Sequence, residues 1–193
     1  MKSILVYCGA NPGLKPIYRE TAIALGKEIA KRNQTLIYGA GSVGLMGIIA
    51  DAVLEEGGKV VGIIPNFLDD LEVGHKSLTE LHKVETMHER KALMEKLCDG
   101  IITLPGGFGS MDELFEILSW SQLGLHQKPV GLLNLNGFYD HILAQLDHMV
   151  AEGFLKQVNR DILQVSDTIE GLYAKMESYV PEPAFKWLER DQT

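Results

Sequence analysis

Apolar runs of strand length alternate with amphipathic stretches of helix length along most of this 193-residue chain. The short runs are apolar at nearly every position, which is typical of strands that are covered on both faces of a sheet. Helices between such strands predict parallel pairing, because each helix carries the chain back to the end at which the next strand begins. The sequence therefore predicts a Rossmann-like, doubly wound α/β fold, a parallel sheet flanked by helices.

The expected elements follow this alternation closely. Strands are predicted at residues 3–9, 35–39, 59–65, 100–105, 128–135 and 161–166, with a further short strand within 80–87. Helices are predicted at residues 16–33, 44–58, 88–98, 110–125, 138–153 and 168–180. The polar stretch 66–78 is expected to be a loop. No linker or repeat divides the pattern, so we expect one domain over residues 1–180 and a C-terminal tail over 181–193.

Composition and charge exclude several classes of function. The net charge is −8 and no basic stripe is present, which argues against a nucleic-acid surface. No apolar run reaches the roughly 20 residues that span a bilayer. The N-terminal apolar run is soon broken by glycine and proline, unlike a signal peptide. We therefore expect a cytoplasmic protein with no membrane partner, and we expect Cys8 and Cys98 to be small buried thiols.

Three glycine-rich stretches each follow a predicted strand: residues 8–13, 38–47 and 104–113. In doubly wound folds, ligands bind beyond the carboxyl ends of the strands. The three stretches are therefore expected to gather around one crevice.

The stretch LPGGFGSMDE, residues 104–113, has two interpretations. Ser110 and Glu113 fit a Ser-x-x-Glu capping box, in which both side chains only satisfy amides at a helix start. That interpretation leaves Gly106, Gly107 and Gly109 unexplained, since a capped helix needs no such turn. Exposed amides, a hydroxyl and a helix N-terminus together form an anion nest, so the pattern favours phosphate binding.

The stretch YGAGSVGLMG, residues 38–47, fits the spacing of a dinucleotide fingerprint through Gly39, Gly41 and Gly44. That fingerprint also needs an acid at the end of the next strand, where this chain has Ile64 and Pro65. A tight turn with no ligand remains the alternative.

The stretch TMHERKALMEKL places Arg90 and Lys91 in the first turns of a predicted helix. Cations are usually found at the other end of a helix, so either the pair lies on a solvated face or Arg90 points into the crevice. The histidines show no convincing ligand spacing, and no serine-hydrolase or pyridoxal-lysine motif is present. We therefore predict neither a metal site nor a cofactor.

Together, MHERK (residues 87–91) and PGGFGSMDE (residues 105–113) resemble the LOG (Lonely Guy) family, the cytokinin riboside 5′-monophosphate phosphoribohydrolases, formerly labelled lysine decarboxylase-like. The family pattern is Pro-Gly-Gly-x-Gly-Thr-x-x-Glu after an Arg-Lys pair, and here Pro105 follows Arg90 by 15 positions. The likeness covers roughly residues 3–165. Ser110 stands where the family usually has threonine, and Ala40 where glycine is common.

The resemblance implies hydrolysis of the N-glycosidic bond of an adenosine 5′-monophosphate, with or without an N6 substituent, as in an AMP nucleosidase. It implies Arg90 and Glu113 as catalytic residues and a homodimer with its sites at the interface. Arg90 is expected to keep Glu113 ionised. The substrate-binding residues that it implies are Glu72, Met87, Lys91, Gly106, Gly107, Gly109, Ser110, Gly41 and Gly44. Glu116, one helical turn beyond Glu113, is expected either to hold Arg90 or to be a surface acid.

Three alternatives stay open at the level of sequence. A binding protein for a nucleotide or phosphorylated cofactor would bind such a ligand without turnover. An NAD(P)-dependent enzyme would use the 39–44 turn, and a decarboxylase would need pyridoxal phosphate. The preferred base, the oligomer beyond a dimer and the physiological role are not encoded in any motif that the chain displays.

Overall fold

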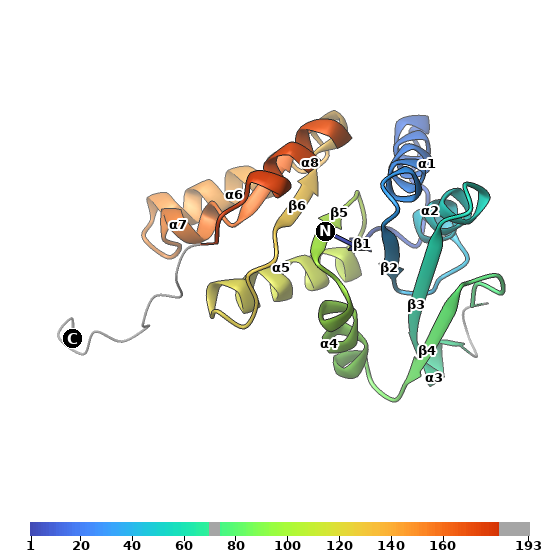
Figure 1. Ribbon diagram of the computed structural model, residues 1–193. Helices are drawn as coiled ribbons and strands as arrows, with labels where there is room; N and C mark the ends of the chain where they lie inside the picture. The colour runs from blue at the N-terminus through green and yellow to red at the C-terminus, as the bar shows by residue number, and fades with distance from the viewer. Residues whose placement is uncertain (70–73, 182–193) are drawn as a thin grey trace.

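The computed structural model describes residues 1–69 and 74–181, and within them it contains one sheet of seven strands. The strands are β1 (Ser3–Tyr7), β2 (Thr35–Tyr38), β3 (Lys59–Pro65), β4 (Glu80–Val84), β5 (Gly100–Thr103), β6 (Val130–Leu133) and β7 (Leu163–Ser166). Every neighbouring pair is parallel, in the order β4-β3-β2-β1-β5-β6-β7 (Figure 1). The predicted Rossmann-like architecture is confirmed.

Helices cover both faces of this sheet. They are α1 (Pro16–Lys31), α2 (Gly44–Glu55), α3 (Asn66–Asp69), α4 (Met87–Leu97), α5 (Phe108–Gln122), α6 (Asp140–Ala151), α7 (Gln157–Arg160) and α8 (Ile169–Ser178), with a 3₁₀ turn η1 (Leu135–Gly137). Side chains of α1, α2 and α8 form one core layer, and those of α4, α5 and α6 form the other. Alternate strand residues feed the two layers: Ile4 and Val6 pack on the first, Leu5 and Tyr7 on the second.

The structure differs from the predicted elements in four places. Residues 66–69 of the expected loop form the short helix α3. The 3₁₀ turn η1 begins at the last residue of a predicted strand, and the short helix α7 lies in a predicted connection. Helix α5 begins at Phe108, two residues before the predicted start at Ser110. The predicted tail lies almost wholly outside the described residues. In the described part of the chain, no helix is long and apolar enough to cross a membrane.

Strands β1 and β5 lie side by side at the centre of the sheet, with Tyr7 opposite Thr103. From β1 the chain proceeds outward through β2, β3 and β4, and α4 then brings it back to β5 on the other side of β1. This reversal is the topological switch point, where loops from two adjacent strands diverge and leave a crevice. The loops that leave β1 and β5 are the first and third glycine-rich stretches of the sequence.

Candidate active site

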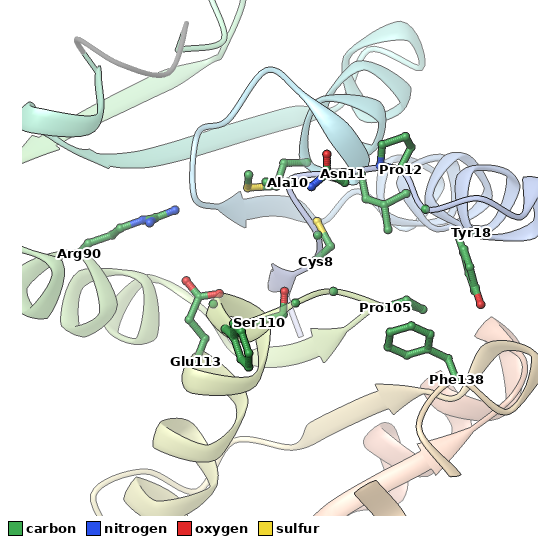
Figure 2. A pocket seen from close by; sticks show the side chains of 18 residues that line it. Cys8, Ala10, Asn11, Pro12, Tyr18, Arg90, Pro105, Ser110, Glu113 and Phe138 are labelled. Atoms are coloured by element: carbon green, nitrogen blue, oxygen red, sulfur yellow. The ribbon is translucent and has the colours of Figure 1, made fainter. Parts of the chain in front are cut away.

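A cavity of about 480 Å³ lies beyond the carboxyl ends of β1 and β5. Its walls are the loop at residues 8–13 and the turn at residues 105–110, together with side chains from α1, α2, α4 and α5 and the ring of Phe138. Figure 2 shows Arg90 and Glu113 directed toward this space from two different helices. The aromatic rings of Tyr18 and Phe138 lie on the opposite side of the cavity, and Ser110 and Cys8 lie between the two groups. The fold therefore brings the two predicted catalytic residues to one cavity.

The first turn of α5 forms the open floor of the cavity. Gly107 is the N-cap residue, in extended conformation, and no side chain caps the helix. Phe108 is 97% exposed and Gly109 is exposed as well. The amide groups of a first helical turn have no partners within their own helix, so this uncapped end is suited to an anion.

The structure contradicts the capping-box interpretation of Ser110 and Glu113, one of the two that the sequence allowed. The helix begins at Phe108 with Gly107 as its N-cap, so Ser110 is its third residue rather than its cap. The Ser110 side chain is only 4% exposed and packs against Gly106, where an added Cβ would lie 2.0 Å from the Ser110 Oγ. Gly106 is therefore required by the close approach of this hydroxyl, and Glu113 is free of any capping duty.

Arg90 lies in the first turns of α4 and is 8% exposed. Its Nη2 donates a hydrogen bond to the Gly39 carbonyl at 3.0 Å, and its Nη1 contacts the Met87 sulfur at 3.7 Å. Its Nε is buried and has no partner among the described residues. A buried guanidinium held at one end and unpaired at another has a donor available for a ligand in the cavity.

Glu113 is half-buried one turn beyond Ser110, and its surroundings alter its protonation. Burial raises the pKa of this carboxyl to about 7, although the positive charge of Arg90 opposes the rise. Arg90 was expected to keep Glu113 ionised; it does lower the pKa, but desolvation outweighs it. The carboxyl is therefore close to half ionised at neutral pH, as a group that exchanges a proton needs to be.

Lys91 contacts two carboxylates of α5. Its Nζ lies 3.1 Å from Asp112 and 3.0 Å from Glu116, and its side chain is 9% exposed. Burial opposes its charge, but these two acids raise the Lys91 pKa. Glu116 pairs with Lys91 rather than with Arg90, and Lys91 does not line the cavity that the described residues enclose. The pair of helices that carries Arg90 and Glu113 is thus joined by ion pairs beside the cavity.

The other predicted binding residues are placed less directly. Gly41 lies in the β2–α2 turn and Gly44 is the first residue of α2, and neither lines the cavity. Gly44, with φ of +63°, approaches the Ala10 carbonyl so closely that a Cβ would lie 2.2 Å from its carbon. Met87 contacts Arg90. Glu72 lies outside the described residues. The roles of these four residues in binding stay predictions.

Sequence reasoning missed several residues that line the cavity. Cys8, Asn11, Tyr18 and Phe138 all border it, and the rings of Tyr18 and Phe138 meet edge to face with centroids 5.8 Å apart. Cys8 and Asn11 lie in the glycine-rich stretch after the first strand, which pointed to the crevice without indicating a binding role for either residue. Tyr18 and Phe138 fall within ordinary helical patterns, so no local signal distinguished them.

Both cysteines are buried free thiols, as predicted. Burial raises the pKa of Cys98 to about 12, and burial also raises the pKa of Cys8, so neither thiol is a nucleophile near neutral pH. Among the described residues, no group of three or more histidine, cysteine or acidic side chains is arranged to hold a metal ion.

Fold and cavity together define a Rossmann-like α/β protein whose switch-point crevice joins an open helix N-terminus to a half-buried carboxyl and a buried arginine. Comparisons with known proteins specify it further. Residues 46–176 match the family model described as "possible lysine decarboxylase". The chain is 46% identical to the cytokinin riboside 5′-monophosphate phosphoribohydrolase LOG of Oryza sativa subsp. japonica, over 94% of this chain and 75% of the relative. It is 45% identical to LOG1 of Arabidopsis thaliana, over 93% and 84%. The chain therefore belongs to the LOG family.

Solved structures share the fold at lower identity. The protein TM1055 superposes with a TM-score of 0.71 at 24% identity, covering 93% of this chain and all of that one. The molybdenum cofactor binding protein of Rippkaea orientalis gives a TM-score of 0.69 at 20% identity, covering 92% and 97%. At these identities the likeness concerns the fold alone.

Proposed function

We propose that this chain hydrolyses the N-glycosidic bond of an adenosine 5′-monophosphate, including N6-substituted forms such as cytokinin riboside 5′-monophosphate. The products are the free base and ribose 5-phosphate. Relatives at 45–46% identity carry the name of this activity. The observation that carries the proposal is the spacing on α5: an uncapped, glycine-rich start and a buried carboxyl one turn later, in one cavity.

The start of α5 would bind the 5′-phosphate. The free amides after Gly107 and the Ser110 hydroxyl supply donors, and the helix dipole favours the negative charge. Three residues separate Ser110 from Glu113, a rise of about 4.5 Å along the helix. A phosphate fixed at the helix start therefore places the anomeric carbon of its ribose near the carboxyl, and such orientation contributes several kcal/mol to catalysis.

Glu113 would act on the reaction centre as a carboxylate. When the bond from the anomeric carbon to the base nitrogen breaks, its electron pair leaves with the base and positive charge develops on the ribose. The carboxylate stabilises that charge and accepts a proton from the water that adds to the anomeric carbon. That proton then passes to the base nitrogen that held the ribose, so the base is released neutral and the carboxylate is restored. A pKa near 7 suits both halves of this cycle, since the group must accept a proton and release it again.

Arg90 would act beside Glu113. Its charge lowers the Glu113 pKa and so increases the fraction of carboxylate present. Its unpaired Nε can donate a hydrogen bond to an oxygen of the bound ribose. The base would then extend past Arg90 toward Met87, whose sulfur contacts the guanidinium. The binding roles of Lys91 and Glu72 stay predictions.

We also propose a homodimer in the cytoplasm, with each site completed at the interface. Phe115, Leu123 and Leu125, on α5 and the turn after it, are 38%, 53% and 68% exposed. Large apolar side chains grouped on one element favour a protein interface. Light scattering after size exclusion is expected to give twice the 21.4 kDa of the chain, and a mass of 21.4 kDa would contradict the dimer.

The proposed activity is tested by a product assay with AMP and with N6-isopentenyl-AMP as substrates. We expect free base and ribose 5-phosphate in equal amounts, with no added metal or cofactor. Calorimetry with AMP is run in parallel. If the protein binds AMP and neither substrate releases base, the hydrolase proposal fails and the chain is a binding protein.

A further inference from the structure

Gly39, the last residue before the β2–α2 turn, has the Arg90 guanidinium where a side chain would be. A Cβ on Gly39 would lie 1.8 Å from Arg90 Nη2 and 3.0 Å from Arg90 Cζ. Two non-bonded heavy atoms do not approach so closely, so any other residue at this position must displace the Arg90 guanidinium. The Gly39 carbonyl meanwhile accepts the hydrogen bond from the same Nη2 at 3.0 Å.

The backbone itself does not require glycine at this position. Positive φ values occur at Gly44 and at Ala40, but not at Gly39. Gly44 must be glycine for its own conformation and for its contact with Ala10. At Gly39 the first three atoms that a Cβ would meet all belong to Arg90. The space that a side chain of residue 39 would fill is therefore occupied by the Arg90 guanidinium.

The turn that follows holds the Gly39 carbonyl in place. Ala40 adopts φ of +61°, a conformation that costs an alanine about 1 kcal/mol or more. Its carbonyl accepts a hydrogen bond from the amide of His75 at 3.2 Å, and Gly41 forms a bridge with Gly74. These contacts fix the peptide after Gly39, and with it the direction of the carbonyl that anchors Arg90.

We propose that Gly39 is a positioning residue for the reaction: its missing side chain and its carbonyl together form the seat that aims the Arg90 guanidinium at Glu113 and the bound ribose. This assignment replaces the dinucleotide-binding role that the glycine spacing suggested. Its kinetic consequence rests on the proposed hydrolase function, whereas its effect on Glu113 does not: that effect follows from the position of the Arg90 charge.

The test is the variant Gly39→Ala, measured in the full chain. The added methyl group displaces the guanidinium, and a shift of about 1 Å in a positioned group can cost on the order of 100-fold in rate. We expect kcat with AMP to fall by that order. In the Arg90→Ala background, the same change at Gly39 is expected to have no further effect, because the group that it displaces is gone.

A second readout does not depend on turnover. Charged or titratable groups that face Glu113 come from three elements: Arg90 and Lys91 of α4, Asp112 and Glu116 of α5, and Tyr7 and Cys8 at the end of β1. Only Arg90 is moved by the substitution, and its charge lowers the Glu113 pKa. The Glu113 titration, followed by the carboxyl ¹³C shift, is therefore expected to move to higher pH in Gly39→Ala.

The matched control is Gly131→Ala in β6. There too a Cβ would press on a flexible side chain, since the Met176 sulfur would lie 2.8 Å from it. Strand β6 is separated by β1 and β5 from β2, the strand that leads to Gly39. We expect a lower melting temperature, an unchanged kcat and an unchanged Glu113 titration. A structural cost of added volume is thereby separated from the positioning of Arg90.

Clear outcomes overturn the proposal. Wild-type kcat and an unshifted Glu113 titration in Gly39→Ala would do so, as would an equal loss of activity with and without Arg90. If Gly39→Ala fails to fold, the double variant Gly39→Ala/Arg90→Ala must fold, since the space is then free; a double variant that also fails shows that Gly39 serves something else. If the wild type releases no base, the hydrolase proposal fails, and the titration alone decides the role of Gly39.

Discussion

Two helices of this protein begin with nearly the same four residues and use them in opposite ways. The N-cap and first three residues of α4 are Thr86-Met87-His88-Glu89, and the first two turns of α5 contain Ser110-Met111-Asp112-Glu113. At α4 the Thr86 hydroxyl accepts a hydrogen bond from the amide of Glu89 at 3.1 Å. The Glu89 carboxylate accepts one from the amide of Glu85 at 2.8 Å, which completes a reciprocal cap.

At α5 the same letters lie inside the helix. The chain enters helical conformation at Phe108, so Ser110 is buried against Gly106 and Glu113 lies in the second turn. At α4, Thr86 and Glu89 accept hydrogen bonds from amides at the helix start. At α5, no side chain caps the helix, so the amides of its first turn stay open. What distinguishes cap from site is therefore where each helix begins. The N-cap of α4 is Thr86 itself, whereas the N-cap of α5 is Gly107, three residues before Ser110.

The largest expected effect separates the two glutamates by activity. Glu113→Gln is expected to lower kcat with AMP by about 10³-fold, because the amide can neither stabilise the developing charge nor accept a proton. Glu89→Gln keeps an oxygen that can accept the bond from the amide of Glu85, so its kcat is expected to stay within twofold of wild type. Equal losses in the two variants would refute the distinction between site and cap.

The same glutamate is expected to reduce stability as pH rises. In the folded chain the Glu113 pKa is about 7, against an ordinary value of 4.5, so its neutral form is favoured by folding. The contribution of Glu113 to the free energy of unfolding is therefore greatest below pH 4.5. It declines by about 3 kcal/mol in all as the pH rises from 4.5 through 7. Activity changes in the other sense, rising with pH through about 7 as the carboxylate forms.

Glu113→Gln removes this penalty, so its unfolding free energy is expected to exceed that of the wild type increasingly between pH 4.5 and 7. Urea denaturation at several pH values measures the difference. Glu89→Gln should show no such growing gain. A wild-type rate that is flat from pH 5 to 9 would show that Glu113 does not ionise in this range during turnover.

These differences indicate how far sequence reasoning reached. Apolar runs and helical periodicity predicted the sheet and its principal helices, because both depend on short-range patterns. The start of α5 was misplaced, since a capping box and a glycine turn compete and only the packed structure decides between them. The seat of Arg90 at Gly39 could not be predicted, because it joins residues 51 positions apart through a tertiary contact. The rise in the Glu113 pKa likewise depends on burial that no local motif encodes.

Closing the open helix should convert α5 toward the state of α4. Gly107 is the N-cap, its φ is not positive, and no atom lies within 4 Å of an added Cβ, so Gly107→Asp fits without strain. Its carboxylate would accept hydrogen bonds from the first-turn amides and repel the substrate phosphate. We expect the KM for AMP to rise at least about tenfold while the melting temperature increases. An unchanged KM would show that the phosphate binds elsewhere.

The smallest effects concern the two hydroxyls, and they sharpen the comparison most. Thr86→Ala removes a cap that contributes about 1 kcal/mol, so the melting temperature should fall by about 2–4 °C with kcat and KM nearly unchanged. Ser110→Ala caps nothing, so its melting temperature should stay within about 1 °C of wild type. Ser110→Ala instead loses one hydrogen bond to the charged phosphate of the substrate, so we expect the KM for AMP to rise roughly five- to tenfold. Thermal melts and initial rates on the two variants measure both quantities. If Ser110→Ala loses stability and keeps its KM, Ser110 is a structural residue and the start of α5 is not the phosphate site.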